Sequence, residues 1–263
     1  MKLLKIEWLK LKKYKTFYIL SGLFLLVFLL INICIDRGYL DIKAGQNASI
    51  SLFSADYSFA AVWQNLSYYY GWSLIFFCVL VIISMSNEFR YKTQRQHIID
   101  GLSRTDFLHA KVLFVVVLSI ILTLFFTLTG LIFGYANGGG NPFEHAQPIL
   151  YVFIYSLNFL SFSALLALLI KRSGLSIMLL MVYVFFENII SSVADKLFNI
   201  QLGRYLPLES SDGLFPFPFG KLFKAMLAPP AQDSNYAIML SMSCVFILVY
   251  YGIARWRMTA ADL

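Results

Sequence analysis

Residues able to do chemistry are sparse in this chain of 263 residues. Its histidines, His97, His109 and His145, show no spacing typical of metal ligands, such as the H-E-x-x-H pattern. No serine stands in a G-x-S-x-G elbow. A protease acting inside a membrane would need several converging ionisable groups, and Glu187 stands alone in the apolar segments. The sequence therefore predicts no catalytic site and no metal site, and we do not expect an enzyme.

Nucleotide and cofactor chemistry have no sequence signature either. The chain has no G-x-x-x-x-G-K-[ST] loop, so we do not expect it to bind ATP in that way. Cys34, Cys78 and Cys244 lie in or at the end of apolar segments without metal-ligand spacing. We interpret them as packing residues and expect no cofactor in this chain.

Glu187 is the ionisable residue that most needs an explanation. It lies in VYVFFENIISS, inside a long apolar segment. A carboxylate at such a place costs roughly 2.5–3.5 kcal/mol on insertion and must face protein or water. Two roles stay open: Glu187 is hydrogen-bonded or protonated and only fixes helix packing, or Glu187 and Asn188 line a polar path or a seam between two chains.

The densest polar block is NEFRYKTQRQHIIDGLSR, residues 87–104. Thr93 followed by Gln96 is a capping box, and Gly101 is a good residue just beyond a helix end, so we expect a short helix over 94–100. Ser103 with Asp106 predicts the start of a second helix. A capped helix with Ile98 and Ile99 as its apolar patch favours a docking surface for a soluble partner, although a simple helical hairpin loop is the alternative.

The elements that must position these residues are membrane-spanning helices. The chain is 59% apolar and only 13% charged, with a mean hydropathy of +0.72, and six windows are long and apolar enough to cross a bilayer. They lie near 17–35, 70–86, 112–134, 149–170, 175–194 and 236–254. We predict an all-α polytopic membrane protein, with 1–263 as a single transmembrane domain; a barrel would show shorter, alternating segments.

The charge distribution predicts the orientation. Of the 21 lysines and arginines, 15 lie before the first window, after the last, or between the second and third and the fourth and fifth. By the positive-inside rule, both termini and the 87–111 loop are expected in the cytoplasm. This sorting accounts for the net charge of +7, and no basic patch interleaved with exposed aromatics predicts a nucleic-acid partner.

The first sixteen residues, MKLLKIEWLKLKKYKT, form an amphipathic pattern. Trp8 and Leu11 share one helical face and the lysines lie on the other, which suits a helix at the membrane surface. Glu7 falls on the apolar face, an unexpected place for a charge. A topology signal without a further role is the alternative for this segment.

The run NEFRYKTQRQHIIDGLSRTDFLHAK closely resembles the second cytoplasmic segment of bacterial type-2 (ABC-2 type) ABC exporter permeases. The N-terminal IEWLKLKKYKTF, the six spans and the terminal WRMTAADL agree with that family. The resemblance implies an elbow helix at 1–16 and a coupling helix within 87–111 that sits in a cleft of a separate ATPase subunit. The residues implied to form this ATPase contact are Glu88, Thr93, Arg95, Ile98, Ile99, Gly101, Ser103 and Arg104.

The same resemblance implies the partners and the place of the protein. ATP and Mg would be bound by the cytoplasmic ATPase subunit, and a second permease chain, identical or related, would complete the pathway. The membrane would be the bacterial cytoplasmic (inner) membrane, with lipid around the spans. Arg104 is expected to pair either with the ATPase or with Glu88.

Two further features bear on packing and on the outer side. Gly130 and Gly134 in GLIFG match the small-xxx-small pattern of close helix contact. The segment 195–235 is long and apolar, and Phe215, Phe217, Phe219 and Phe223 are expected at an outer gate or at the membrane interface. The resemblance implies short helices here that re-enter from outside, and an interfacial anchor is the alternative.

The function that this sequence favours is the permease subunit of an ATP-driven exporter. The apolar outer segment leans toward a lipid-like, lipid-linked or amphipathic peptide substrate. The alternative is a non-transporting scaffold or immunity-type subunit that uses the same fold and the same ATPase partner.

Overall fold

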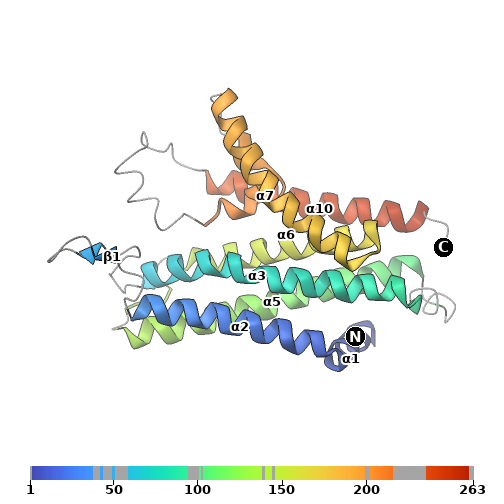
Figure 1. The fold of residues 1–263 in the computed structure, drawn as a ribbon, viewed down its shortest axis with the longest axis horizontal. Coiled ribbons are helices and arrows are strands. Elements are labelled where there is room, and N and C mark those ends of the chain that lie inside the picture. The colour runs from blue at the N-terminus through green and yellow to red at the C-terminus, as the bar shows by residue number, and fades with distance from the viewer. Residues whose placement is uncertain are drawn as a thin grey trace.

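A computed structural model describes the chain except for residues 1, 38–41, 44–48, 51–58, 94–100, 102, 138–139, 144–145, 199–201, 216–234 and 261–263. The described part is almost entirely helical, apart from a two-residue strand pair in which Ile42 lies opposite Ile50 (Figure 1). In chain order the elements are α1 (Lys2–Lys13), α2 (Lys15–Asp36), β1 (Ile42–Lys43), β2 (Ser49–Ile50), α3 (Phe59–Arg90), α5 (Arg104–Ala136), α6 (Gln147–Ile170), α7 (Ser173–Phe198), η1 (Leu202–Tyr205), α8 (Glu209–Asp212) and α10 (Tyr236–Ala260).

Six of the described helices, α2, α3, α5, α6, α7 and α10, are long and apolar enough to cross a membrane. This confirms the predicted all-α polytopic fold with six spans. The second predicted window, 70–86, is too short, because α3 already begins at Phe59. Its first turns contain polar residues that lower the hydropathy, but Phe59 and Trp63 there are buried against a neighbouring helix, so protein packing supports them.

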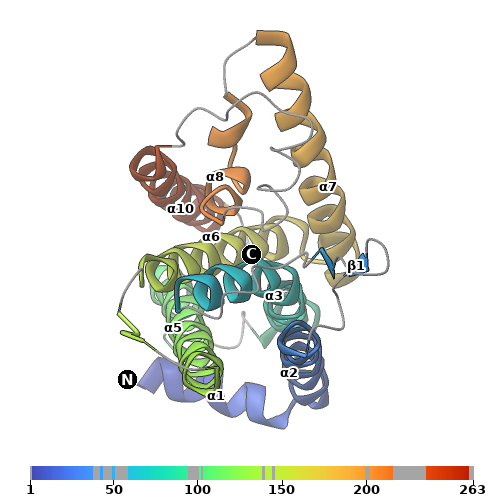
Figure 2. The ribbon, with the colours of Figure 1, turned by 90° about the vertical axis from the view of Figure 1, so that its left-hand side faces the viewer.

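The spans form a bundle around α6, which is the most buried of the six (Figures 1 and 2). Helix α6 packs against α3, α5 and α10. Helix α1, the last turn of α3, the first turn of α5 and the last turns of α10 lie at one end of the bundle, which we call the α1 end (Figure 1). Helix α1 and the last turns of α10 thus lie at the same end, and the predicted cytoplasmic side of the termini stays a prediction.

Helix α7 leaves the bundle at an angle, and η1 and α8 lie in the space between α7 and α10 (Figure 2). We call this region, with the adjoining parts of α6, α7 and α10, the α8 end. Short helical turns therefore occur between the fifth and sixth spans, where re-entrant or interfacial helices were expected.

Close approach of α3 and α5 depends on two glycines. A Cβ atom added at Gly130 would lie 2.1 Å from the ring of Trp63, and one at Gly134 would lie 2.1 Å from the ring of Phe59. Both distances are far below van der Waals contact, so the aromatic rings of α3 occupy the space that larger residues on α5 would need.

Candidate functional site

Four charged side chains meet at the α1 end. The ammonium Nζ of Lys111 lies 2.7 Å from a carboxylate oxygen of Glu7 and 2.5 Å from one of Glu88. All three residues are buried, with exposed fractions of 5% for Glu7, 6% for Glu88 and 2% for Lys111. Two buried carboxylates around one ammonium ion would carry a net negative charge, which is costly away from water.

Lys10 supplies the second positive charge. Its Nζ donates to Glu88 at 3.0 Å and to Glu7 at 3.4 Å, and its side chain is partly exposed. Burial lowers the pKa of Lys10, but the carboxylates of Glu88 and Glu7 outweigh that effect and raise its pKa above the ordinary value of 10.5. Lys10 thus stays protonated at neutral pH, and the cluster of Glu7, Lys10, Glu88 and Lys111, the charge cluster below, is formally neutral.

The charge cluster joins three elements. Glu7 and Lys10 belong to α1, Glu88 lies in the last turn of α3, and Lys111 lies two turns into α5. Helices α3 and α5 lie on either side of residues 91–103, the middle of the polar block. The cluster therefore fixes both ends of that block and attaches α1 to them, which explains why a charge stands on the apolar face of the N-terminal helix.

The capping residues of the polar block have defined partners where the structure describes them. Ser103 caps α5 by accepting a hydrogen bond from the backbone N–H of Asp106 at 3.0 Å, as its sequence signature predicts. Gly101 has a φ of +96°, a conformation that favours glycine just beyond a helix end. The hydroxyl of Thr93 donates back to the carbonyl of Glu88 in α3 at 3.3 Å, and its predicted role as a cap of 94–100 stays a prediction.

The centre of the block is outside the described residues. The predicted helix at 94–100, with Arg95, Ile98 and Ile99, falls there, and so does the side chain of Arg104. The sequence left open whether Glu88 pairs with Arg104; in the structure Glu88 pairs with Lys111 and Lys10.

Glu187 lies at the α8 end and has a different environment. Its side chain is 4% exposed. One carboxylate oxygen accepts hydrogen bonds from the backbone N–H groups of Leu208 at 2.8 Å and Glu209 at 3.4 Å. No ion pair of Glu187 with a lysine or arginine is found in the described part of the chain. Backbone amides at the start of α8 thus stabilise this carboxylate.

The segment from η1 to α8 is attached to three spans. In addition to Glu187 on α7, the amide of Asn158 on α6 donates to the carbonyl of Pro207 at 2.8 Å and to the hydroxyl of Ser211 at 2.9 Å. Ser210 lies 3.1 Å from Ser243 of α10, oxygen to oxygen. Side chains of three spans therefore hold this short segment through its polar atoms.

The remaining predicted residues are only partly placed. Phe215 is buried and its ring lies 5.0 Å from that of Tyr155 of α6, centroid to centroid. Phe217, Phe219 and Phe223 are outside the described residues, as is the side chain of Asn188.

Sequence reasoning missed the roles of Lys111, Lys10 and Asn158. The signal for the charge cluster was present: Glu7 on an apolar helical face and Lys111 next to a span are opposite charges that both require a partner. No sequence signal pointed from Asn158 to residues 207–211, because that contact joins segments 49 and 53 residues apart.

Together, six spans, a charge cluster at one end and a tethered short helix at the other define a polytopic helical membrane protein without a group of His, Cys, Asp or Glu suited to a metal in its described residues. The family model of the ABC-2 family transporter proteins matches residues 3–187, which is more than two thirds of the chain. The chain therefore belongs to this family. No curated protein and no solved structure matches it.

The matched range contains the whole charge cluster and ends at Glu187. Membership makes this chain a multi-pass membrane component of a transporter, and the family implies association with an ATP-binding subunit.

Proposed function

We propose that this chain is the permease subunit of an ATP-driven exporter, and that a separate soluble ATPase docks at its α1 end and drives it. The family match over residues 3–187 is the observation that carries the proposal. In this proposal the chain itself has no catalytic role, and ATP and Mg belong to the partner. The membrane is the bacterial cytoplasmic membrane, with the α1 end inside.

The docking end follows from charge and from rigidity. The positive-inside rule favours the α1 end as cytoplasmic, since both termini and the 87–111 loop carry the excess of lysine and arginine. The charge cluster anchors the polar block, because Glu88 and Lys111 are paired and lie on the helices on either side of it. When the ATPase displaces residues 94–100, the charge cluster can transmit this movement to α3, α5 and α1 together.

The proposed substrate is lipid-like, lipid-linked or an amphipathic peptide, and a second permease chain completes the pathway. Support for the substrate class comes from the sequence of residues 215–227, which is rich in phenylalanine and leucine. The aromatic contact of Phe215 with Tyr155 is compatible with an apolar outer gate at the α8 end.

Reconstitution in lipid nanodiscs tests the proposal. The chain would be purified with its co-expressed ATPase, and ATP hydrolysis measured with and without lipid-linked and amphipathic peptide candidates. We expect substrate-stimulated hydrolysis, and loss of the ATPase from the complex in the variant Ile98→Asp/Ile99→Asp. Phe143→Asp, at an 80% exposed position in the connection between α5 and α6, is the matched control and should keep the ATPase.

Two outcomes would overturn the proposal. If the Ile98→Asp/Ile99→Asp variant keeps the ATPase at the wild-type ratio, the α1 end is not the docking site. If no candidate changes hydrolysis while the ATPase stays bound, a non-transporting scaffold role is favoured instead.

A further inference from the structure

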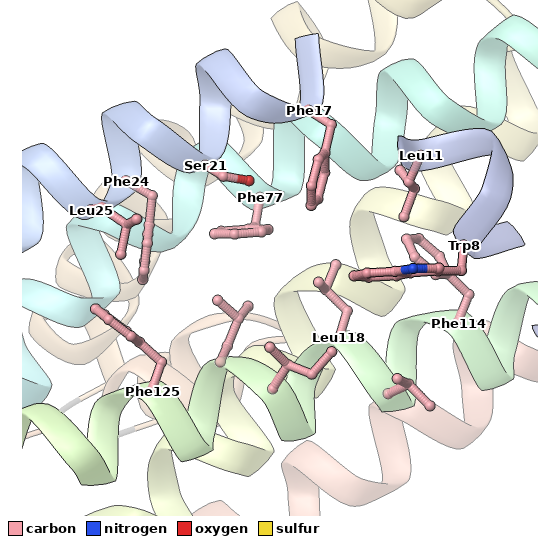
Figure 3. Close-up of a pocket in the computed structure, with 13 residues that line it drawn as sticks. Trp8, Leu11, Phe17, Ser21, Phe24, Leu25, Phe77, Phe114, Leu118 and Phe125 are labelled. Atoms are coloured by element: carbon pink, nitrogen blue, oxygen red, sulfur yellow. The ribbon is translucent and has the colours of Figure 1, made fainter. Parts of the chain in front are cut away.

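An elongated apolar cavity lies between α2 and α5, with α1 at one end (Figure 3). Its volume is about 230 Å³, well above the water-sized voids that are usual in packed protein. The walls come from α1, α2, α3 and α5 (Figure 3). The lining residues are Trp8, Leu11, Phe17, Ser21, Phe24, Leu25, Phe77, Phe114, Val117, Leu118, Ile121, Leu122 and Phe125.

The cavity has the length of one half of a bilayer. Along α5 it extends from Phe114 to Phe125, which at 1.5 Å per residue is about 16 Å. The hydrocarbon core of a bilayer is about 30 Å thick, so one leaflet measures about 15 Å. The cavity runs along the helices rather than across them (Figure 3), as an acyl chain in a leaflet does.

Aromatic side chains line the two ends. At the α1 end, Trp8 reaches from α1 toward α5, with Phe17 next to it at 6.4 Å between ring centroids (Figure 3). At the deep end, the ring of Phe24 lies 4.9 Å from that of Phe77 and 5.7 Å from that of Phe125. Because aromatic rings line both ends, they limit the length of an apolar ligand that fits between them.

The long side is open. Leu25 of α2 is 40% exposed and Ile121 of α5 is 45% exposed, and these residues form the rim between the two helices. For a membrane-embedded chain this rim faces lipid. A side-chain-lined apolar cavity that adjoins lipid fills with an apolar ligand rather than with water, because water would lack polar partners there.

Charge near the α1 end favours an anionic head group. Lys12 and Lys15 are exposed, and they stand one residue after Leu11 and two residues before Phe17, which both line the cavity. The acidic residue of α1, Glu7, is already paired with Lys111. Exposed lysines near the membrane surface attract anionic head groups.

We propose that this cavity is a binding site for one anionic phospholipid, with an acyl chain in the cavity and the phosphate near Lys12 and Lys15. The lipid is a bound component rather than the transported substrate. It supports α1, and therefore the position of Glu7 in the charge cluster. The site requires neither the ATPase nor a second chain.

The test compares two neighbouring positions on α2. Ser21→Leu fills the cavity, and it removes a buried hydroxyl that has no hydrogen-bond partner among the described residues. Gly22→Leu is the matched control: a Cβ atom there meets nothing within 4 Å, and the next residue points about 100° away. Native mass spectrometry of the purified chain, titrated with phosphatidylglycerol or phosphatidylcholine, measures lipid binding.

We expect wild type and Gly22→Leu to retain one phosphatidylglycerol, with at least about tenfold weaker binding in Ser21→Leu. Phosphatidylcholine should bind more weakly than phosphatidylglycerol to wild type, and the double variant Lys12→Gln/Lys15→Gln should remove that preference. Equal retention in Ser21→Leu and Gly22→Leu would overturn the proposal, as would equal binding of the two lipids by wild type.

A second measurement does not depend on the folding of Ser21→Leu. Tryptophan fluorescence of wild type minus that of Trp8→Phe isolates Trp8, which lines the cavity. Anionic phospholipids brominated on the acyl chain should quench this difference signal saturably, and unbrominated phosphatidylglycerol should reverse the quenching. Quenching that rises linearly without saturation would show bulk lipid contact and contradict a site.

Discussion

The two ends of this molecule stabilise buried carboxylates in different ways. At the α1 end, Glu7 and Glu88 are paired with the ammonium groups of Lys111 and Lys10. At the α8 end, Glu187 accepts hydrogen bonds from two backbone N–H groups. Ion pairs join side chains on three separate helices and need no special backbone, whereas amide donors exist only where the chain turns toward the carboxylate. The first arrangement secures helices to one another, and the second secures a short segment to a helix.

The largest expected effect is at Lys111. Lys111→Met should destabilise the chain by about 3–5 kcal/mol, because it leaves two buried carboxylates with only the partly exposed Lys10. Thermal unfolding in detergent measures the change. Adding Glu7→Gln and Glu88→Gln to Lys111→Met should recover much of the loss. If Lys111→Met alone unfolds at the same temperature as wild type, the charge cluster does not stabilise the α1 end.

At the other end, removal of the Glu187 carboxylate should cost about 3 kcal/mol, since two N–H donors lose their acceptor. The change to test is Glu187→Leu, with Glu187→Gln as the control that keeps an acceptor oxygen. Hydrogen exchange of the amides of Leu208 and Glu209 should speed up in the leucine variant and stay near wild type in the glutamine variant. Equal protection in both variants would mean that Glu187 does not secure α8.

Gly203 tests whether close backbone contact between η1 and α7 stabilises the α8 end. A Cβ atom there would lie 2.5 Å from the Cα and 2.6 Å from the carbonyl oxygen of Ser191. Gly203→Ala should therefore destabilise by about 2 kcal/mol, since backbone atoms cannot rotate away. Gly174→Ala is the matched control, because a Cβ atom added there meets nothing within 4 Å. The unfolding temperature of this variant should equal or exceed that of wild type. If Gly203→Ala unfolds at the same temperature as Gly174→Ala, the tight contact with Ser191 is excluded.

The smallest effect is expected at Lys10. Lys10→Met should cost about 1 kcal/mol, less than the changes above, because the side chain is partly exposed and water at its place screens the negative charge that is left. The pKa of Lys10 is raised, so its contribution is complete at neutral pH and is lost only as the pH rises through that raised value, above 10.5. The difference from wild type should therefore be constant from about pH 6 to about pH 9. A difference that changes within this window would point to a different partner.

The sequence was sufficient for the six spans and for the cap of α5 at Ser103, because hydropathy and capping are local properties. It was not sufficient for the starts of the longer helices. Helix α3 begins at Phe59 because rings at Phe59 and Trp63 pack on Gly134 and Gly130, a contact between helices far apart in the chain.

The partners of the buried charges were likewise beyond the sequence. Glu7 and Lys111 are 104 residues apart, and Glu187 is 21 residues from Leu208. The sequence indicated that Glu7 and Glu187 each needed a partner, since burial of a lone carboxylate is costly. Only the packing of the spans decides whether that partner is a lysine or a backbone amide.

The most direct test of the proposed ATPase docking is site-specific photo-crosslinking of the intact complex. A photoreactive phenylalanine would replace Tyr91, 63% exposed at the end of α3, or Phe143, 80% exposed at the opposite end. With the co-expressed ATPase present, we predict a crosslinked ATPase band from position 91 and none from position 143. A band from position 143 with none from position 91 would contradict docking at the α1 end.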